Sequence, residues 1–166
     1  MEWKRKPGTW QMTEHTKKGV CYVSFPLLDA ERGFVHGFST RIGGVSEGDL
    51  SSMNLSFTRG DDPERVRENY RRIAAGVGLE TDRRVLTHQT HTNHVRVVTE
   101  ADAGKGFVRE RDYTDVDGLV TDVPQLVLTT FYADCVPLFF IGPIHKAIGL
   151  SHSGWRGTVS DIAAAT

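Results

Sequence analysis

Short runs of apolar and β-branched residues, separated by polar turn residues, recur along most of this chain. Each run ends at or near Gly, Pro or Asp, which is typical of strands bounded by turns. The predicted strands are residues 19–25, 34–39, 84–87, 94–98, 118–121, 126–131, 136–141 and 147–151. The pattern therefore predicts a protein built mostly from sheet.

One segment departs from this pattern and predicts a helix. Asp61 or Asp62 can cap it, Pro63 suits its first turn, and Gly76 and Gly78 favour its end. The apolar positions at helical spacing are Val66, Tyr70, Ile73, Ala74 and Val77. The opposite side is charged, as expected of a solvated face with i,i+4 ion pairs.

Two further segments bear on the organisation of the chain. Residues 41–56 form a long loop rich in Gly, Ser and Asn, and a loop of this kind is either disordered or functional. Residues 160–166 begin a helix that receives no second turn, which suggests a fragment of a longer protein. We predict a single α+β domain over residues 1–166, with mixed, largely antiparallel β-sheet layers flanked by helices.

Composition narrows the function. The chain has 166 residues and a formal net charge of -1, so it carries no general field that would attract nucleic acid or an anionic membrane. Its apolar runs are too short to span a bilayer, and residues 1–7 are not followed by the apolar region of a signal peptide. The two cysteines, Cys21 and Cys135, indicate reduced thiols in a cytoplasmic protein.

Reactive side chains concentrate in residues 87–95, 132–137 and 151–158, each at the edge of a predicted strand. His91, Cys135 and His152 could supply three zinc ligands and leave a fourth position open. Their spacing is not that of a local zinc motif. If the first segment is extended, His91 faces opposite to His88 and His94, and this alternation does not choose between the two faces.

Two neighbours could support such a site. Asp134 could accept a hydrogen bond that orients a histidine ligand, or it could be a turn residue. Residues 155–158 form a predicted loop before a helix start, where Arg156 could hold an anion or could pair structurally.

At these segments the chain resembles the YlmD/YfiH-type family of purine nucleoside phosphorylases, long described as laccase-like multicopper polyphenol oxidases. The strings that carry the resemblance run in family order over about residues 34–162: Phe38–Ser46, Asn54–Ser56, Gly60–Asp62 with Val66 and Asn69, Gln89–His91, Asp117–Thr121, Ala133–Pro137 and His152–Thr158. Mild departures are Thr92, Ser151 and Ser153, where the family usually has smaller residues.

The resemblance implies a YfiH-like α/β sandwich, similar to the fold of a toxin deamidase, that continues beyond residue 166. It implies one zinc ion held by His91, Cys135 and His152, which would also be the catalytic residues. It implies phosphorolysis of adenosine, inosine and methylthioadenosine, with adenosine deamination as a second activity. The expected partners are a purine nucleoside and phosphate, and the oligomeric state stays open.

Phosphate needs a cationic, hydrogen-bonding site. We expect Arg41 and Arg156 to bind it, with Ser39 and Asn54 as hydrogen-bonding neighbours in the substrate site. Three alternatives stay open: a metal-free hydrolase or deamidase that uses Cys135 with His152, a polyphenol oxidase, and a binding module whose zinc is closed by a fourth ligand such as His94. Copper could also occupy a His/Cys site adventitiously. An oxidase with several copper centres would need more imidazoles than the 7 histidines provide.

Overall fold

The computed structural model describes residues 12–166, so the prediction about residues 1–7 lies outside the described residues. The chain divides into two compact units, of which the first ends at Leu79 and the second begins at Glu80. A single domain over residues 1–166 therefore stays a prediction. The α+β fold with mixed, largely antiparallel sheets is confirmed by the strand pairings that follow.

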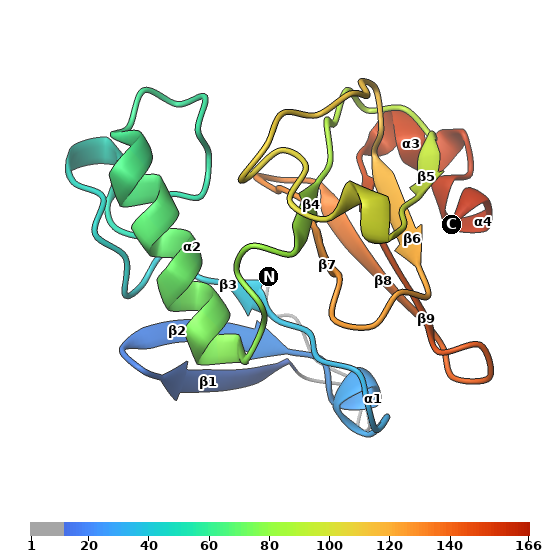
Figure 1. Cartoon of the computed structure of the whole chain (residues 1–166), viewed down its shortest axis with the longest axis horizontal. Helices are drawn as coiled ribbons and strands as arrows, with labels where there is room; N and C mark the ends of the chain where they lie inside the picture. Colours follow the sequence, from blue (N-terminus) through green and yellow to red (C-terminus); the bar gives the residue numbers. More distant parts are fainter. Residues whose placement is uncertain (1–11) are drawn as a thin grey trace, which may run out of the picture. The chain divides into compact units, whose positions relative to one another are not determined.

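In the first unit, a small antiparallel sheet packs against one helix (Figure 1). Its strands are β1 (Thr13–Lys17), β2 (Val20–Ser24) and β3 (Phe38–Ser39), with the four-residue α1 (Pro26–Asp29) after β2. The helix α2 (Pro63–Val77) packs on β2 through a core of Val20, Tyr22, Met53 and Ile73. The predicted strand at residues 34–39 is thus limited to its last two residues. β1 escaped prediction because it is a mostly exposed edge strand of polar residues.

The helix α2 begins after Asp62 and ends at Gly78 as predicted, whereas Gly76 lies inside it. The carboxylate of Asp62 accepts a hydrogen bond from the backbone N–H of Glu64, and Gly78 ends the helix in the left-handed region. Asp61 instead accepts hydrogen bonds from Ser46 Oγ and Asn54 Nδ2. These contacts fasten the loop of residues 41–56, which contains a short 3-10 helix, η1 (Gly48–Leu50), to the start of α2.

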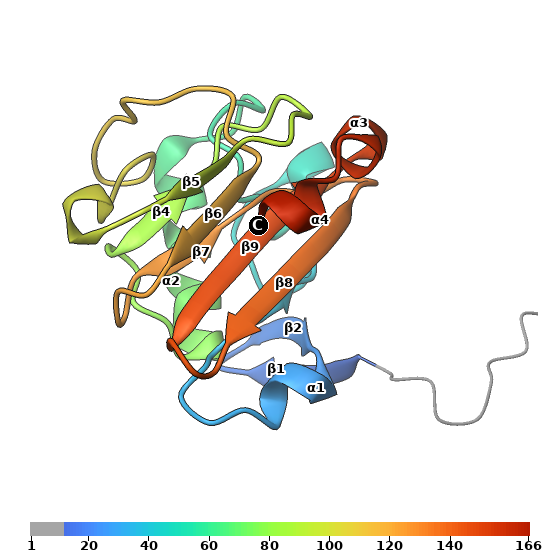
Figure 2. The same cartoon turned by 90° about the vertical axis from the view of Figure 1, so that its right-hand side faces the viewer.

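In the second unit, a four-stranded mixed sheet has the order β5-β6-β9-β8, and Figure 2 shows it face-on. Its strands are β5 (Val95–Val97), β6 (Gly118–Thr121), β8 (Val136–Gly142) and β9 (Ala147–Ser153). A separate two-stranded parallel sheet pairs β4 (Arg84–Leu86) with β7 (Val127–Thr129). A further 3-10 helix is η2 (Glu100–Asp102), and the chain ends in two short helices, α3 (Trp155–Val159) and α4 (Ile162–Ala165).

The core of the second unit is one cluster of buried apolar side chains. Its buried members are Val85, Val98, Val116, Leu119 and Leu126. They come from β4, β6 and the segments that flank β5, β6 and β7. In register, Pro137 of β8 faces His152 of β9, and Gly118 of β6 faces Ser151. The residues just before β6 and β8 therefore meet near the end of β9.

Candidate metal centre

His91 is aimed by a bend in the loop between β4 and β5. Its φ is 65°, in the left-handed region that is uncommon for residues other than glycine. The segment is therefore not extended at His91, and the condition under which its side chains would alternate is not met. Nearby, His88 Nδ1 accepts a hydrogen bond from the backbone N–H of Asp115, and His94 Nδ1 lies 3.2 Å from the Asp115 carbonyl oxygen. Both flanking imidazoles are thus engaged by the segment before β6.

Cys135 stands directly before β8, in a turn tied to the His91 loop. The side-chain amide of Gln89 donates to the carbonyl of Phe131 and accepts from its N–H, each at 2.7 Å. This pair of bonds joins segments that are 42 residues apart in the sequence. Gln89, two positions before His91, thereby joins the His91 loop to the segment between β7 and β8 that carries the thiol.

His152 lies in β9 and is only 4% exposed. Its Nδ1 is 2.8 Å from the carboxylate of Asp117, which is fully buried. The ring packs against Tyr132, with 5.7 Å between the two ring centroids. Asp117 also accepts hydrogen bonds from the backbone N–H groups of Thr90, His91 and Thr92. The same carboxylate therefore touches two of the reactive segments.

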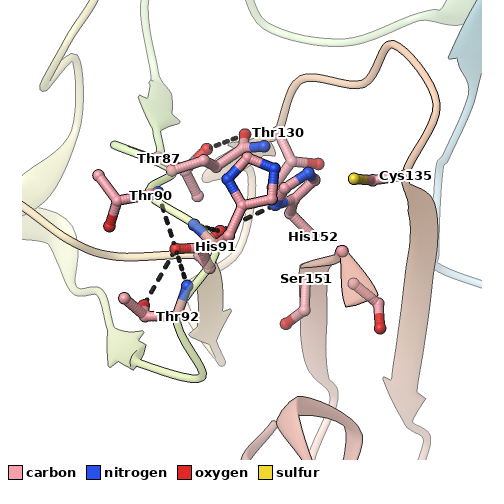
Figure 3. A network of polar contacts seen from close by, with 12 residues as sticks. Thr87, Thr90, His91, Thr92, Thr130, Cys135, Ser151 and His152 are labelled. Atoms are coloured by element: carbon pink, nitrogen blue, oxygen red, sulfur yellow. Dashed lines mark hydrogen bonds and ion pairs between the residues drawn. The ribbon is translucent and has the colours of Figure 1, made fainter. Parts of the chain in front are cut away.

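The structure brings His91, Cys135 and His152 together (Figure 3). One ligand atom from each lies within 4.8 Å of the others, and within residues 12–166 they form the one such group of His, Cys, Asp or Glu. The imidazoles of His91 and His152 meet edge to face, 4.9 Å between centroids. Gly154 leaves room for the group: a Cβ there would lie 2.7 Å from His91 Cδ2 and 3.1 Å from Cys135 Sγ.

The electrostatics of the site are set by carboxylates. Burial alone would raise the pKa of Asp117, but the N–H groups of Thr92 and Thr90 and the ring of His152 outweigh it, so the pKa is lowered. Burial raises the pKa of the Cys135 thiol, and the negative charges of Asp134 and Asp117 raise it further. Without a cation this cysteine is therefore protonated at neutral pH, whereas a bound metal would favour its thiolate.

Of the two roles left open for Asp134, the structure shows the turn residue, because Asp134 lies in the bend before β8. The thiol of Cys135 donates weakly to Asp134, 3.7 Å away, and the carboxylate that bonds to a histidine is Asp117. In the sequence, the signal for Asp117 is an Asp-Gly pair at the start of a predicted strand, within the family string Asp117–Thr121.

The predicted substrate residues divide between the two units. Arg156 lies two residues after Gly154, but in the helix α3 rather than in the predicted loop, because Gly154 caps a helical turn there. It is exposed, and its guanidinium stacks 5.4 Å from the Trp155 ring. In the first unit, Ser39 pairs with Tyr22 at the sheet edge.

Arg41 and Asn54 of the first unit already have partners within that unit. Arg41 donates to the carbonyl oxygens of Asp49 and Ser51, and Asn54 donates to Ser56 and Asp61. These bonds shape the loop of residues 41–56. The roles of Ser39, Arg41, Asn54 and Arg156 in binding substrate stay predictions.

The set of donors fits one metal ion. Two imidazoles and one thiol suit zinc or copper, and the exposed side of His91 leaves the group open toward solvent. His94, named above as a possible fourth ligand, does not belong to the group. Within the described chain, no helix has the length and apolar character needed to cross a bilayer. Fold and site together define an α+β protein with one open His/Cys/His centre.

Comparison with known proteins shows which family this chain belongs to. The family model for the multi-copper polyphenol oxidoreductase laccase matches residues 35–166, and the chain belongs to that family. Purine nucleoside phosphorylase YlmD of Geobacillus stearothermophilus is 38% identical over 135 residues, which cover 79% of this chain and 48% of that protein. Purine nucleoside phosphorylase LACC1 of Mus musculus is 37% identical over 153 residues, covering 90% of this chain and 33% of that protein.

Solved structures agree. The crystal structure of YlmD from Geobacillus stearothermophilus superposes with a TM-score of 0.78 at 35% identity, over 91% of this chain and 55% of that one. Bacillus licheniformis YfiH gives a TM-score of 0.73 at 35% identity, over 78% and 49%. The resemblance to the YlmD/YfiH-type family is confirmed, as is the fold. The chain spans about half the length of the YlmD relative.

Proposed function

We propose that this chain contributes the metal centre of a zinc-dependent purine nucleoside phosphorylase. The observation that carries the proposal is the convergence of His91, Cys135 and His152 within 4.8 Å. The relatives named purine nucleoside phosphorylase support the reaction. We propose adenosine, inosine and methylthioadenosine as nucleosides, phosphate as the second substrate, and deamination of adenosine as a side activity.

Zinc is the metal that we propose for the site. Zinc binds imidazole and thiolate ligands, and its catalytic sites use three protein ligands, so the open side of the group leaves room for a substrate atom. A zinc ion at this position would supply a Lewis acid. The free thiols Cys21 and Cys135 are consistent with the reducing cytoplasm, which we propose as the location.

The residues of the chain would bind the substrates. Among the predicted phosphate ligands, Arg156 is better supported than Arg41, because its guanidinium is exposed two residues from Gly154. The Arg41 guanidinium is bonded to main-chain carbonyls. We propose Arg156 as the first phosphate ligand and Arg41 as the second candidate, with Ser39 and Asn54 as hydrogen-bonding neighbours of the substrate.

The alternative is a cysteine hydrolase in which His152, held by Asp117, would activate Cys135. A nucleophilic cysteine needs a lowered pKa, whereas burial and two neighbouring carboxylates raise the pKa of the Cys135 thiol. This electrostatic setting disfavours the hydrolase and favours a thiol that ionises on binding a metal.

The test is to assay zinc in the purified protein and to incubate it with adenosine, with and without phosphate. Phosphate-dependent release of adenine and ribose 1-phosphate supports phosphorolysis, and inosine supports deamination. The C135S variant should lose zinc and activity, while C21S, the change of the other thiol, should keep both. Full activity in the presence of a chelator, or oxidation of a polyphenol without any phosphorolysis, would refute the proposal.

A further inference from the structure

The Asp117 carboxylate is enclosed by groups from the two histidine segments. Its Oδ1 accepts hydrogen bonds from His91 N at 3.1 Å and from His152 Nδ1 at 2.8 Å. Its Oδ2 accepts from the backbone N–H groups of Thr90 and Thr92 and from Thr92 Oγ1, each at 3.0 Å. None of the side chain is exposed. Both oxygens are therefore fully used.

We propose that Asp117 is the positioning residue of the metal centre, which fixes both the ring of His152 and the loop that presents His91. The inference rests on the proposed function only in that it takes the His/Cys/His group to bind a metal. It does not depend on which reaction follows.

The contact with His152 selects one tautomer. An ionised carboxylate only accepts hydrogen bonds, so the proton of the neutral imidazole must lie on Nδ1. The Nε2 lone pair is then available for a metal. A carboxylate behind a ligating imidazole also makes that ligand more basic and holds its ring in one orientation.

The contact with the loop selects its bend. Three consecutive N–H groups, at Thr90, His91 and Thr92, point to one carboxylate, as they do around bound anions. This arrangement holds His91 at its φ of 65°. Without an anionic acceptor, the three N–H donors would lose their common partner, and no hydrogen bond from Asp117 would stabilise the bent backbone at His91. One side chain thus links two ligands that are 61 positions apart in the sequence.

The substitution Asp117→Asn is the most direct test, because the amide NH2 group replaces one carboxylate oxygen and so turns one acceptor into a donor. If the NH2 group faces His152, it favours the tautomer with the proton on Nε2, which blocks metal binding. If the NH2 group faces Thr90 and Thr92, it opposes two N–H donors. Two matched controls exist. D102N changes the other nearly buried aspartate of the second unit, and D115N changes an exposed neighbour that bonds to Thr90 Oγ1.

The experiment measures zinc affinity by competition with a chelator and the tautomer of His152 by nitrogen NMR of the metal-free protein. We expect D117N to bind zinc about 10- to 100-fold more weakly and to shift the proton toward Nε2. D102N and D115N should bind zinc as the unchanged protein does. Wild-type affinity and tautomer in D117N would overturn the proposal, as would an equal loss of affinity in D102N.

Two further outcomes remain decisive. If D117N does not fold, the tautomer of the unchanged metal-free protein still tests the idea, because a proton on His152 Nε2 contradicts it. If zinc binding and the tautomer behave as expected but no nucleoside is cleaved, the proposed function fails and the role of Asp117 stands.

Discussion

Asp117 and Asp102 are both almost completely buried in the second unit, at 0% and 4% exposure, yet their surroundings differ. Asp102 is neutralised by cations: Lys105 Nζ lies 2.7 Å from its carboxylate and an Arg96 nitrogen 3.1 Å. Asp117 is held by neutral N–H and O–H donors and by one imidazole. The two carboxylates reach low pKa values by different means.

The Asp102 cluster is closed on itself. Burial alone would raise the pKa of Asp102, but hydrogen bonds from Lys105, Thr99 and Arg96 lower it well below its usual range. Lys105 also pairs with Asp112, and Arg96 lies over the ring of Tyr113. These contacts join residues 96–113 to one another. The cluster serves to hold that segment together.

The Asp117 cluster keeps its negative charge uncompensated by any fixed cation in the described chain, apart from His152 when protonated. A metal bound to His152 would supply the missing positive charge through the ring. The aspartate next to lysine and arginine joins neighbouring residues of one segment, whereas the aspartate next to backbone amides contacts His152 and the loop of His91.

The first prediction, with the greatest change in zinc affinity, concerns Gly154. Ala at Gly154 should weaken zinc binding by about 100-fold, because the added Cβ meets His91 and Cys135 and displaces the ligands. The φ of Gly154 is -74°, so alanine introduces no backbone strain. G142A, at the far end of β8 where a Cβ meets only ordinary contacts, is the control. Unchanged zinc affinity in G154A would show that the ligands converge elsewhere.

The second prediction concerns stability. D102N should lower the free energy of unfolding by about 2 kcal/mol, because it weakens charge-assisted hydrogen bonds from Lys105 and Arg96. Urea unfolding measures this loss. Because no ligand contacts Asp102, its zinc affinity should not change, and a parallel loss of zinc would remove the distinction between the two clusters.

The third prediction follows from the lowered pKa of Asp102. A carboxyl group whose pKa is lower in the folded state stabilises the fold fully above its unfolded value of about 4, and this contribution is lost as pH falls toward the folded value. The metal-free protein should therefore lose stability below about pH 4, and D102N should lose less over the same range. Identical acid-unfolding curves for the two proteins would contradict this.

The smallest effect is expected from T92V, which keeps the shape of the side chain but removes a hydroxyl that bonds to Asp117, to the Asp115 carbonyl and to the His94 N–H. Zinc affinity should fall by less than about tenfold, because four other donors remain. T121V removes a buried hydroxyl that donates to the Val98 carbonyl, away from the ligands, and should cost stability alone. Equal zinc affinity in T92V and T121V would mean that the hydroxyl contributes nothing to the site.

Much of the fold could be predicted from the sequence because its elements carry local signals. Asp62, Pro63 and Gly78 mark α2, and apolar runs mark β6, β8 and β9. β1 carries no apolar alternation because it lies exposed at a sheet edge. The short helix α3 was read as a loop, since its five residues include a glycine and a β-branched pair.

The site was less predictable from residue patterns. Alternation applies only to an extended segment, whereas the backbone bends at His91, whose N–H donates to Asp117, 26 residues further along. The pairing of β8 with β9 that brings Cys135 toward His152 is likewise a long-range event. The resemblance predicted His91, Cys135 and His152 as one metal site because the family strings contain all three residues, although the strings do not show which contacts bring them together.

We propose that His91, Cys135 and His152 hold one metal ion with one side open. X-ray absorption at the zinc edge of the zinc-loaded protein tests it most directly. We expect the zinc ion to have one sulfur at about 2.3 Å, two imidazole nitrogens at about 2.0 Å and one further light atom as neighbours. A shell without sulfur, or zinc still bound stoichiometrically in C135S, would contradict it.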